Sequence, residues 1–115
     1  MNADPDCIFC KIVAGQIPAR KVFEDEELLA FHDIHPWAPV HVLVIPKLHI
    51  ASLAEVGPQH HALLGRMLGL APRLMKELGV VNGFRTVVNT GRDGGQEVPH
   101  LHMHVFGGPR PWAKG

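Results

Sequence analysis

Hydrophobic residues gather in five short stretches of the chain, which predicts about five β-strands. The first two stretches flank the acidic residues 25–27, and this pattern is typical of a hairpin. The third is β-branched and apolar apart from His41, and Pro46 ends it, so it is expected at the centre of a sheet. The predicted strands are residues 21–24, 28–32, 40–45, 84–89 and 100–106.

A longer stretch, residues 58–78, carries the repeat of an amphipathic helix. Pro58 is favoured at a first helical position, and Gly79 is a natural stop. The apolar side chains that recur at helical spacing are Leu64, Met67, Leu68, Ala71, Leu74, Met75 and Leu78. A second, short helix is expected at residues 7–13.

These elements predict an α+β fold in which one long helix packs on a five-stranded antiparallel sheet, with a short N-terminal helix beside it. With 115 residues, of which 46% are hydrophobic, the chain is expected to form a single domain over residues 1–115. Residues 1–6 are expected to be a flexible N-terminus, and residues 109–115 a proline-rich tail.

Charge narrows the classes of partner. Basic and acidic side chains number 11 each, so the formal net charge is zero. Binders of nucleic acid or of anionic membranes normally have a basic excess, and neither partner is expected here. The acidic N-terminus is unlike a signal peptide, and no run approaches the ~20 apolar residues of a membrane span, which predicts a cytoplasmic protein. The compositional anomaly is the number of histidines, nine.

Three of these histidines alternate with apolar residues in the last predicted strand. Side chains of a strand alternate between faces, so His100, His102 and His104 are expected on one face, with imidazoles about 6.7 Å apart. The glycine-rich loop at residues 89–99 precedes them, and its backbone N–H groups suit an anion. Three interpretations remain open: a solvated edge strand, a metal site, and phosphate chemistry with histidine as nucleophile or acid and base.

Cys7 and Cys10 form a second candidate site, because a Cys-x-x-Cys pair can bind a metal. In a reducing compartment a disulfide is disfavoured, and a thioredoxin-like motif lacks its usual flanking elements. Two packed thiols or two of the four ligands of a zinc ion are the remaining interpretations.

The chain resembles the histidine-triad (HIT) family, and most closely its Hint branch of nucleotide-binding phosphoramidases. Residues 100–106 match the family signature, in which single apolar residues separate three histidines and two apolar residues follow the third. Residues 31–34, 41–50 and 88–96 match further motifs, so the resemblance extends from about Cys7 to Gly108. It implies the fold predicted above, assembled as a homodimer across the long helix and a sheet strand.

The resemblance also implies roles for individual residues. His102 would be the nucleophile, His104 would contact the phosphate and help to deliver a proton, and His41 and His100 would complete the catalytic set. Asp33 would accept the ribose hydroxyls. The remaining nucleotide-binding positions are Ile8, Phe9, Ile12, Phe31, His32 and Ile34 around the base and Asn89, Gly95, Gln96 and Glu97 on the phosphate side. A structural zinc would be bound by Cys7, Cys10, His49 and His100, and catalysis would need no cofactor.

The activity so implied is cleavage of the phosphorus–nitrogen bond of purine nucleoside phosphoramidates, such as adenosine 5′-monophosphoramidate, through a nucleotidyl-histidine. The alternatives are a dinucleoside polyphosphate hydrolase and a nucleotide-binding or interaction module with vestigial activity. Glu97 is a departure from the closest Hint relatives, which often carry at this position a hydroxyl residue that contacts the phosphate. A carboxylate that faced the phosphate would repel it. Trp112 resembles a C-terminal tryptophan that reaches toward the partner subunit, although its spacing in the tail differs.

Overall fold

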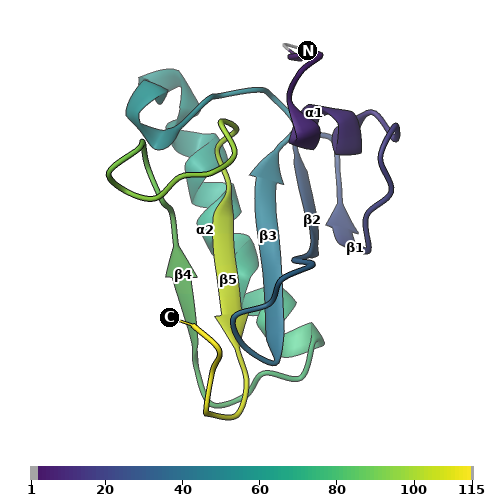
Figure 1. Ribbon diagram of the computed structural model, residues 1–115, viewed down its shortest axis with the longest axis vertical. Coiled ribbons are helices and arrows are strands. Elements are labelled where there is room, and N and C mark those ends of the chain that lie inside the picture. The colour runs from purple at the N-terminus through teal and green to yellow at the C-terminus, as the bar shows by residue number, and fades with distance from the viewer. Residues whose placement is uncertain (1–2, 115) are drawn as a thin grey trace.

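The fold was analysed in a computed structural model that describes residues 3–114, so the expected N-terminus and tail are covered except for residues 1–2 and 115. One antiparallel sheet has the strand order β1-β2-β3-β5-β4, which confirms the predicted α+β architecture (Figure 1). The elements are α1 (Ile8–Val13), β1 (Lys21–Glu24), β2 (Leu28–His32), β3 (Val40–Pro46), α2 (His61–Glu77), β4 (Phe84–Val87) and β5 (Met103–Gly107).

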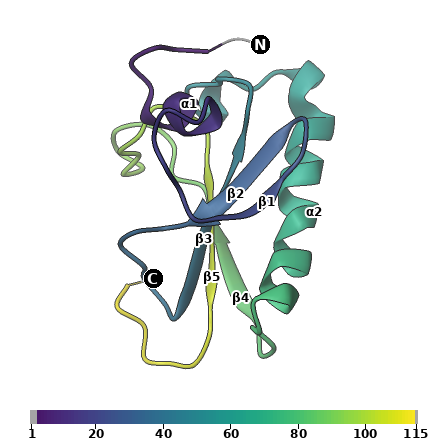
Figure 2. The same cartoon turned by 90° about the vertical axis from the view of Figure 1, so that its right-hand side faces the viewer.

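The sheet has two different faces. Helix α2 covers one of them, while α1 and the loop between β2 and β3 lie on the other (Figure 2). Beneath α2, the residues Leu101, Met103 and Val105 pack with helix side chains in the main hydrophobic core. The histidines between them therefore lie on the face that α2 leaves open, as the alternation of side chains predicts.

The histidine strand is shorter than predicted. Its regular pairing begins at Met103 and not at residue 100, because the Leu101 N–H donates to the carbonyl of Ile50, outside the sheet, at 2.7 Å. β4 likewise ends at Val87, two residues early, where the chain turns into the glycine loop. Neither change moves a histidine to the other face, because Leu101 remains in the core with Met103.

The long helix begins at His61, after a 3-10 turn at Pro58–His60, so the predicted start is three residues early. The prediction that Leu68 belongs to the buried face is wrong, since its side chain is 57% exposed. At 100° per residue Leu68 lies at the edge of the arc centred on Ala71 and Leu74, which are both buried. Among residues 3–114, no helix is both long and apolar enough to cross a membrane.

Candidate active site

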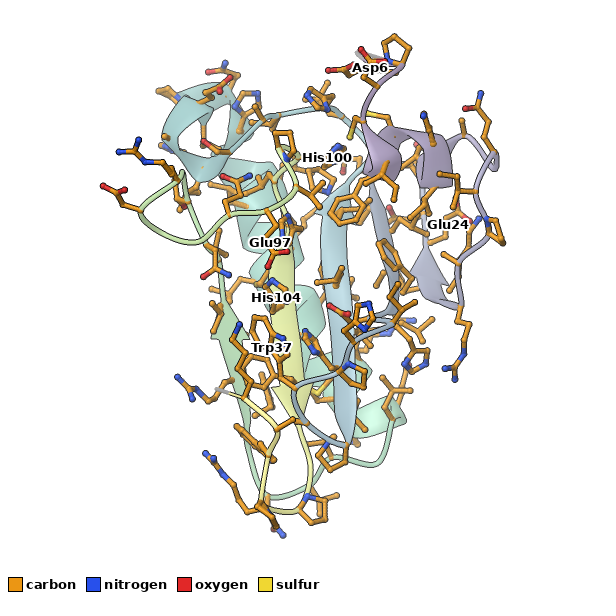
Figure 3. All side chains as sticks on the ribbon, in the orientation of Figure 1. Asp6, Glu24, Trp37, Glu97, His100 and His104 are labelled. Carbon is orange, nitrogen blue, oxygen red and sulfur yellow. The ribbon has the colours of Figure 1, made fainter. Side chains whose placement is uncertain are left out.

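Sheet order brings the histidines together. β5 lies between β3 and β4, and its residues His104 and Phe106 pair with Leu43 and His41 of β3. His41, predicted to be a polar residue in a buried strand, is 2% exposed, and the three triad histidines are buried as well. Figure 3 shows the open face of the sheet, with His104 on β5 at its centre.

A backbone carbonyl fixes the tautomer of His102. Its Nδ1 lies 2.7 Å from the carbonyl oxygen of His100. A carbonyl can only accept, so Nδ1 carries the proton and Nε2 keeps its lone pair. The Phe9 ring packs edge-on against this imidazole, with centroids 5.2 Å apart. His102 therefore presents an unprotonated nitrogen, as a nucleophile requires.

His104 has the opposite tautomer. The backbone N–H of Trp37 donates to Nδ1 of His41 at 3.0 Å, so the proton of neutral His41 is on Nε2. That Nε2 donates to Nδ1 of His104 at 2.9 Å, which leaves the His104 proton on its Nε2. His102, which precedes β5, thus offers a lone pair, and His104 in β5 offers a hydrogen-bond donor.

Burial favours the neutral form of the His41 and His104 imidazoles. Burial and the neighbouring His102 and His41 lower the pKa of His104 from its usual 6.5 to about 4. Burial also lowers the pKa of His41, although the Asp33 carboxylate acts in the opposite direction. Neutral rings are the form on which the hydrogen-bond assignments depend, so the pKa shifts and the geometry agree.

Asp33 lies at the end of β2, beside the histidine pair. Its Oδ1 accepts the backbone N–H of His35 at 2.7 Å. Its Oδ2 is 3.6 Å from Nε2 of His41 and 4.0 Å from Nδ1 of His104. This carboxylate can compensate a positive charge on the pair and retains lone pairs for another donor, such as a ribose hydroxyl.

Trp37 is a site residue that the sequence interpretation missed. Its ring stacks on His104 with centroids 4.3 Å apart and an interplanar angle of 21°, and Figure 3 shows the two side by side. A large aromatic between Pro36 and Ala38-Pro39, four residues before His41, was the available signal. This signal does not place the Trp37 ring, because the sequence of a proline-bounded loop does not show which strand the loop folds over.

The residues expected around the base divide into buried and exposed sets. Phe9, Ile12 and Phe31 are buried in the second core cluster, where Phe9 and Phe31 pack edge to face at 5.7 Å. Ile8 is exposed, Ile34 is 85% exposed, and His32 is half-buried. The structure thus places Phe9 against the triad and leaves Ile8 and Ile34 accessible.

The residues expected on the phosphate side come from the loop after β4. Asn89 and Gly95 line a groove beside His104, together with Trp37. Gln96 fastens the loop instead, since its Nε2 donates to the carbonyls of Ala51 and Val98 at 2.8 and 2.9 Å. Its Oε1 accepts the Gly91 N–H, so the side chain links the two ends of the turn at residues 91–96.

Glu97 is exposed and lines a separate groove of about 260 Å³ with Asp4, Asp6, Cys7 and Ile8. In Figure 3 it lies between His100 and His104 on the open face of the sheet. The groove beside Asn89 does not include it.

The four residues expected to bind zinc form one cluster. Their ligand atoms lie within 4.8 Å of one another, and three of the residues are buried. Nδ1 of His100 is 3.2 Å from Sγ of Cys7 and 3.2 Å from Nδ1 of His49, whose Nδ1 is 3.3 Å from Sγ of Cys10. A tetrahedral zinc with these ligands has edges of about 3.3 to 3.8 Å, so the donor set is consistent with a zinc site.

Neighbouring groups orient the cluster for a metal. The carbonyl of Pro46 accepts from Nε2 of His100 at 2.8 Å, which leaves Nδ1 unprotonated and pointed at the thiols. Burial lowers the pKa of His100 to about 4, so the ring is neutral, as a metal ligand must be. The backbone N–H groups of Asp4 and Cys10 donate to the sulfurs of Cys10 and Cys7. Burial raises the pKa of the Cys7 thiol, and the N–H of Cys10 acts in the opposite direction. The thiolate is the form that binds zinc.

Four buried histidines and a Cys2His2 cluster beside them are the features of a histidine-triad protein. A family model described as the HIT domain matches residues 14–110, and the chain belongs to this family.

Protein HitA of Neisseria gonorrhoeae is 53% identical over 104 residues, which are 90% of this chain and 97% of that protein. The structure of a HIT family hydrolase from Legionella pneumophila Philadelphia 1 superposes with a TM-score of 0.88 at 47% identity, covering 91% of this chain and 95% of that one. A zinc-bound histidine triad family protein from Mycobacterium smegmatis is 36% identical, with a TM-score of 0.76, and covers 87% of this chain and 73% of that chain.

Proposed function

We propose that the chain is a nucleotide-binding hydrolase of the Hint branch that cleaves the phosphorus–nitrogen bond of purine nucleoside phosphoramidates through a nucleotidyl-histidine. The observation that carries this proposal is the pair of opposite tautomers: His102 with a free Nε2 and His104 with an Nε2–H. The likeness to proteins described as HIT family hydrolases supports the reaction class.

In the first step Nε2 of His102 attacks phosphorus, a bond from that nitrogen to phosphorus forms, and the phosphorus–nitrogen bond of the substrate breaks. The leaving nitrogen takes one proton through His104. A bound anion raises the pKa of an imidazole beside it, so His104 takes a proton from solvent on Nδ1 as substrate binds, and its Nε2 proton goes to the leaving nitrogen. Protonated Nδ1 no longer accepts from Nε2 of His41, and Oδ2 of Asp33, 3.6 Å from that nitrogen, is the acceptor in its place. The Asp33 carboxylate, 4.0 Å from Nδ1 of His104, compensates the charge.

In the second step water attacks the same phosphorus and the bond to His102 breaks. The proton lost by the water passes to Nε2 of His104, and His104 releases its extra proton to solvent when the product anion leaves, so both rings return to their starting forms. The hydrogen bond from Nδ1 of His102 to the His100 carbonyl persists through both steps, and it holds the ring in position for attack.

Asp33 is proposed to bind the ribose. The accessible side chains of Ile8 and Ile34 are proposed to contact the base, together with Phe9, which packs against His102. A dinucleoside polyphosphate hydrolase, which would release two nucleotides from one substrate, remains the alternative within the same chemistry.

Zinc is proposed at Cys7, Cys10, His49 and His100. Zinc bound there would supply a structural cross-link with no open position for catalysis. This cross-link would join α1 to the end of β3 and to the segment that leads into β5. His100 has two roles in this arrangement: its ring belongs to the cluster, and its carbonyl holds His102.

A homodimer across α2 and β4 is also proposed. Apolar side chains are exposed along this side of the molecule, including Leu68 on α2, Val81 after it and Phe84 on β4. Burying them against a second copy would remove an apolar patch from water. Sedimentation equilibrium of wild type and of Leu68→Glu tests this, since the charge is expected to shift the protein toward monomer. A wild type that sediments as a monomer would contradict it.

The enzymatic proposal is tested by rapid quench with adenosine 5′-monophosphoramidate, intact-mass measurement and peptide mapping. Wild type is expected to form an adenylyl adduct on His102, and His102→Ala is expected to form none while still binding AMP. His104→Ala is expected to slow the reaction. His61→Ala, at the exposed start of α2, is the matched control and should behave as wild type. An adduct on His104, or full turnover by His102→Ala, would refute the assignment.

A further inference from the structure

A groove of about 330 Å³ begins beside the proton donor of the site and runs toward β4. It contains side chains from the loop before β3, from β4 and β5, from the glycine loop and from the C-terminal tail. Its lining residues are Trp37, Arg85, Val87, Asn89, Gly94, Gly95, Phe106 and Lys114.

Strand register places this groove next to His104. Val87 of β4 pairs with His104, and Arg85 pairs with Phe106, so both β4 side chains face the same side of the sheet as the catalytic imidazole. Phe9 and the zinc-type cluster lie toward β2 and α1, on the other side of the triad. In Figure 1, β4 lies at one edge of the sheet and α1 above the opposite half.

The groove contains two cations and no acidic lining residue. The Arg85 guanidinium lies 5.8 Å from the centroid of Phe106, and Nζ of Lys114 lies 5.0 Å from the centroid of Trp37. Within residues 3–114 neither cation has a carboxylate within 4.0 Å, and the same holds for Lys11, Arg20 and Lys76. The other six basic side chains are in ion pairs or stacked elsewhere. The Lys114 charge also acts on His104, whose pKa it lowers.

The two grooves therefore carry opposite charges. The groove on the α1 side is lined by Asp4, Asp6 and Glu97, and the groove on the β4 side by Arg85 and Lys114. The formal net charge of the chain is zero, so this separation of charge between the two grooves does not come from an overall excess of either sign. An anionic group that enters the site is attracted to the β4 side and repelled from the other.

In-line displacement at phosphorus requires the leaving group to depart opposite the nucleophile and close to the proton donor. With the ribose and base on the side of Asp33 and Phe9, the free space next to His104 is the β4 groove. We propose that this groove is the leaving-group subsite, and that it selects amines that carry an anionic group such as a carboxylate. This inference rests on the proposed function. Arg85 and Lys114 bind the anion, while Trp37 and Phe106 provide an apolar floor.

The test compares two substrates, the adenosine 5′-phosphoramidates of phenylalanine and of phenylalaninamide. Both substrates have the same phenyl ring and nearly the same size. The only difference is that the first carries a carboxylate where the second carries a neutral carboxamide. Wild type is expected to favour the carboxylate about 10-fold in kcat/KM at low salt, because hydrogen bonds to charged groups are the stronger ones. The ratio is expected to fall toward one as salt screens exposed charges.

Arg85→Gln and Lys114→Gln are each expected to reduce the ratio about threefold or more, and the double variant to abolish the preference. Arg73→Gln is the matched control, because Arg73 is an exposed arginine on α2 that pairs with Glu77 on the far side of the sheet. It should keep the wild-type ratio. Thermal unfolding of each variant confirms that the fold is retained.

Two failures are distinguishable. A wild-type ratio of one or less, or variants that keep the wild-type ratio, would overturn the subsite while turnover of both substrates leaves the phosphoramidase proposal intact. No turnover of either substrate or of adenosine 5′-monophosphoramidate, with no adduct on His102, would overturn the proposed function and the subsite with it.

Discussion

His41 makes two hydrogen bonds, one at each ring nitrogen, and substitution by asparagine or glutamine is expected to remove one of them and keep the other. An asparagine amide reaches the place of Nδ1, so its oxygen still accepts the Trp37 N–H. A glutamine amide reaches the place of Nε2, so its NH₂ still donates to Nδ1 of His104. The native bonds are 3.0 and 2.9 Å long, and the ring is buried. Each variant therefore keeps one bond and loses the other.

Both variants are expected to lose stability, for different reasons. His41→Gln leaves a part-buried N–H without an acceptor, at a cost of about 1 to 3 kcal/mol. His41→Asn removes ring atoms from a site that is 2% exposed and leaves a small void, at a cost of similar size. For a chain of this length each kcal/mol lowers Tm by about 4 °C. The two melting temperatures are thus expected to be similar, a few degrees below wild type.

Activity is expected to separate them. His41→Gln preserves the donor that keeps the His104 proton on Nε2, and kcat/KM for adenosine 5′-monophosphoramidate should fall by less than about 10-fold. His41→Asn removes that donor, and a loss of about 100-fold is expected, as for a weakened general acid. His41→Ala loses both bonds and should be worst in both assays. Equal activity of the Asn and Gln variants at equal stability would refute the tautomer chain.

Three further predictions concern zinc, ribose and pH. Elemental analysis should find near one zinc per chain, sharply reduced in Cys7→Ser/Cys10→Ser; metal-free wild type of undiminished thermal stability would contradict the site. Asp33→Ala should weaken AMP binding about 10- to 100-fold, as one charge-assisted bond of about 1.5 to 3 kcal/mol is lost, with a smaller effect for the 2′,3′-dideoxy analogue. Because the pKa of His104 is about 4 in the fold against 6.5 ordinarily, its contribution to stability is complete above pH 6.5 and is lost as the pH falls toward 4. Urea unfolding of wild type should show this loss, and His104→Gln should lose less over the same range; equal slopes would contradict the burial argument.

Local pattern was sufficient for much of the fold. Alternation along residues 100–106 placed the histidines opposite Leu101 and Met103, and this holds although the regular strand begins at Met103. It holds because side-chain direction in an extended chain depends on backbone geometry and not on hydrogen-bonded pairing. The long helix was likewise predicted from its apolar repeat, while the position of Leu68 at the edge of that repeat was not, since the width of the buried face depends on the sheet it meets.

For the site, too, the sequence indicated which residues take part, and the tertiary structure decided how they are arranged. Residue types alone pointed to three histidines, a fourth on another strand and a pair of cysteines, and the resemblance to the histidine-triad family added His49 and His100 as the other two zinc ligands. Only the tertiary structure decided which nitrogen of each ring is free, because the acceptors and donors that set the tautomers are backbone groups of His100, Pro46 and Trp37. It also placed Trp37 over His104 and gathered Arg85 and Lys114 at one groove. The contacts of Pro46 with His100 and of Trp37 with His104 join segments far apart in sequence, so they depend on sheet order and loop packing. The bonds of His100 with His102 and of Trp37 with His41 are local, but they depend on loop conformations that no apolar pattern encodes.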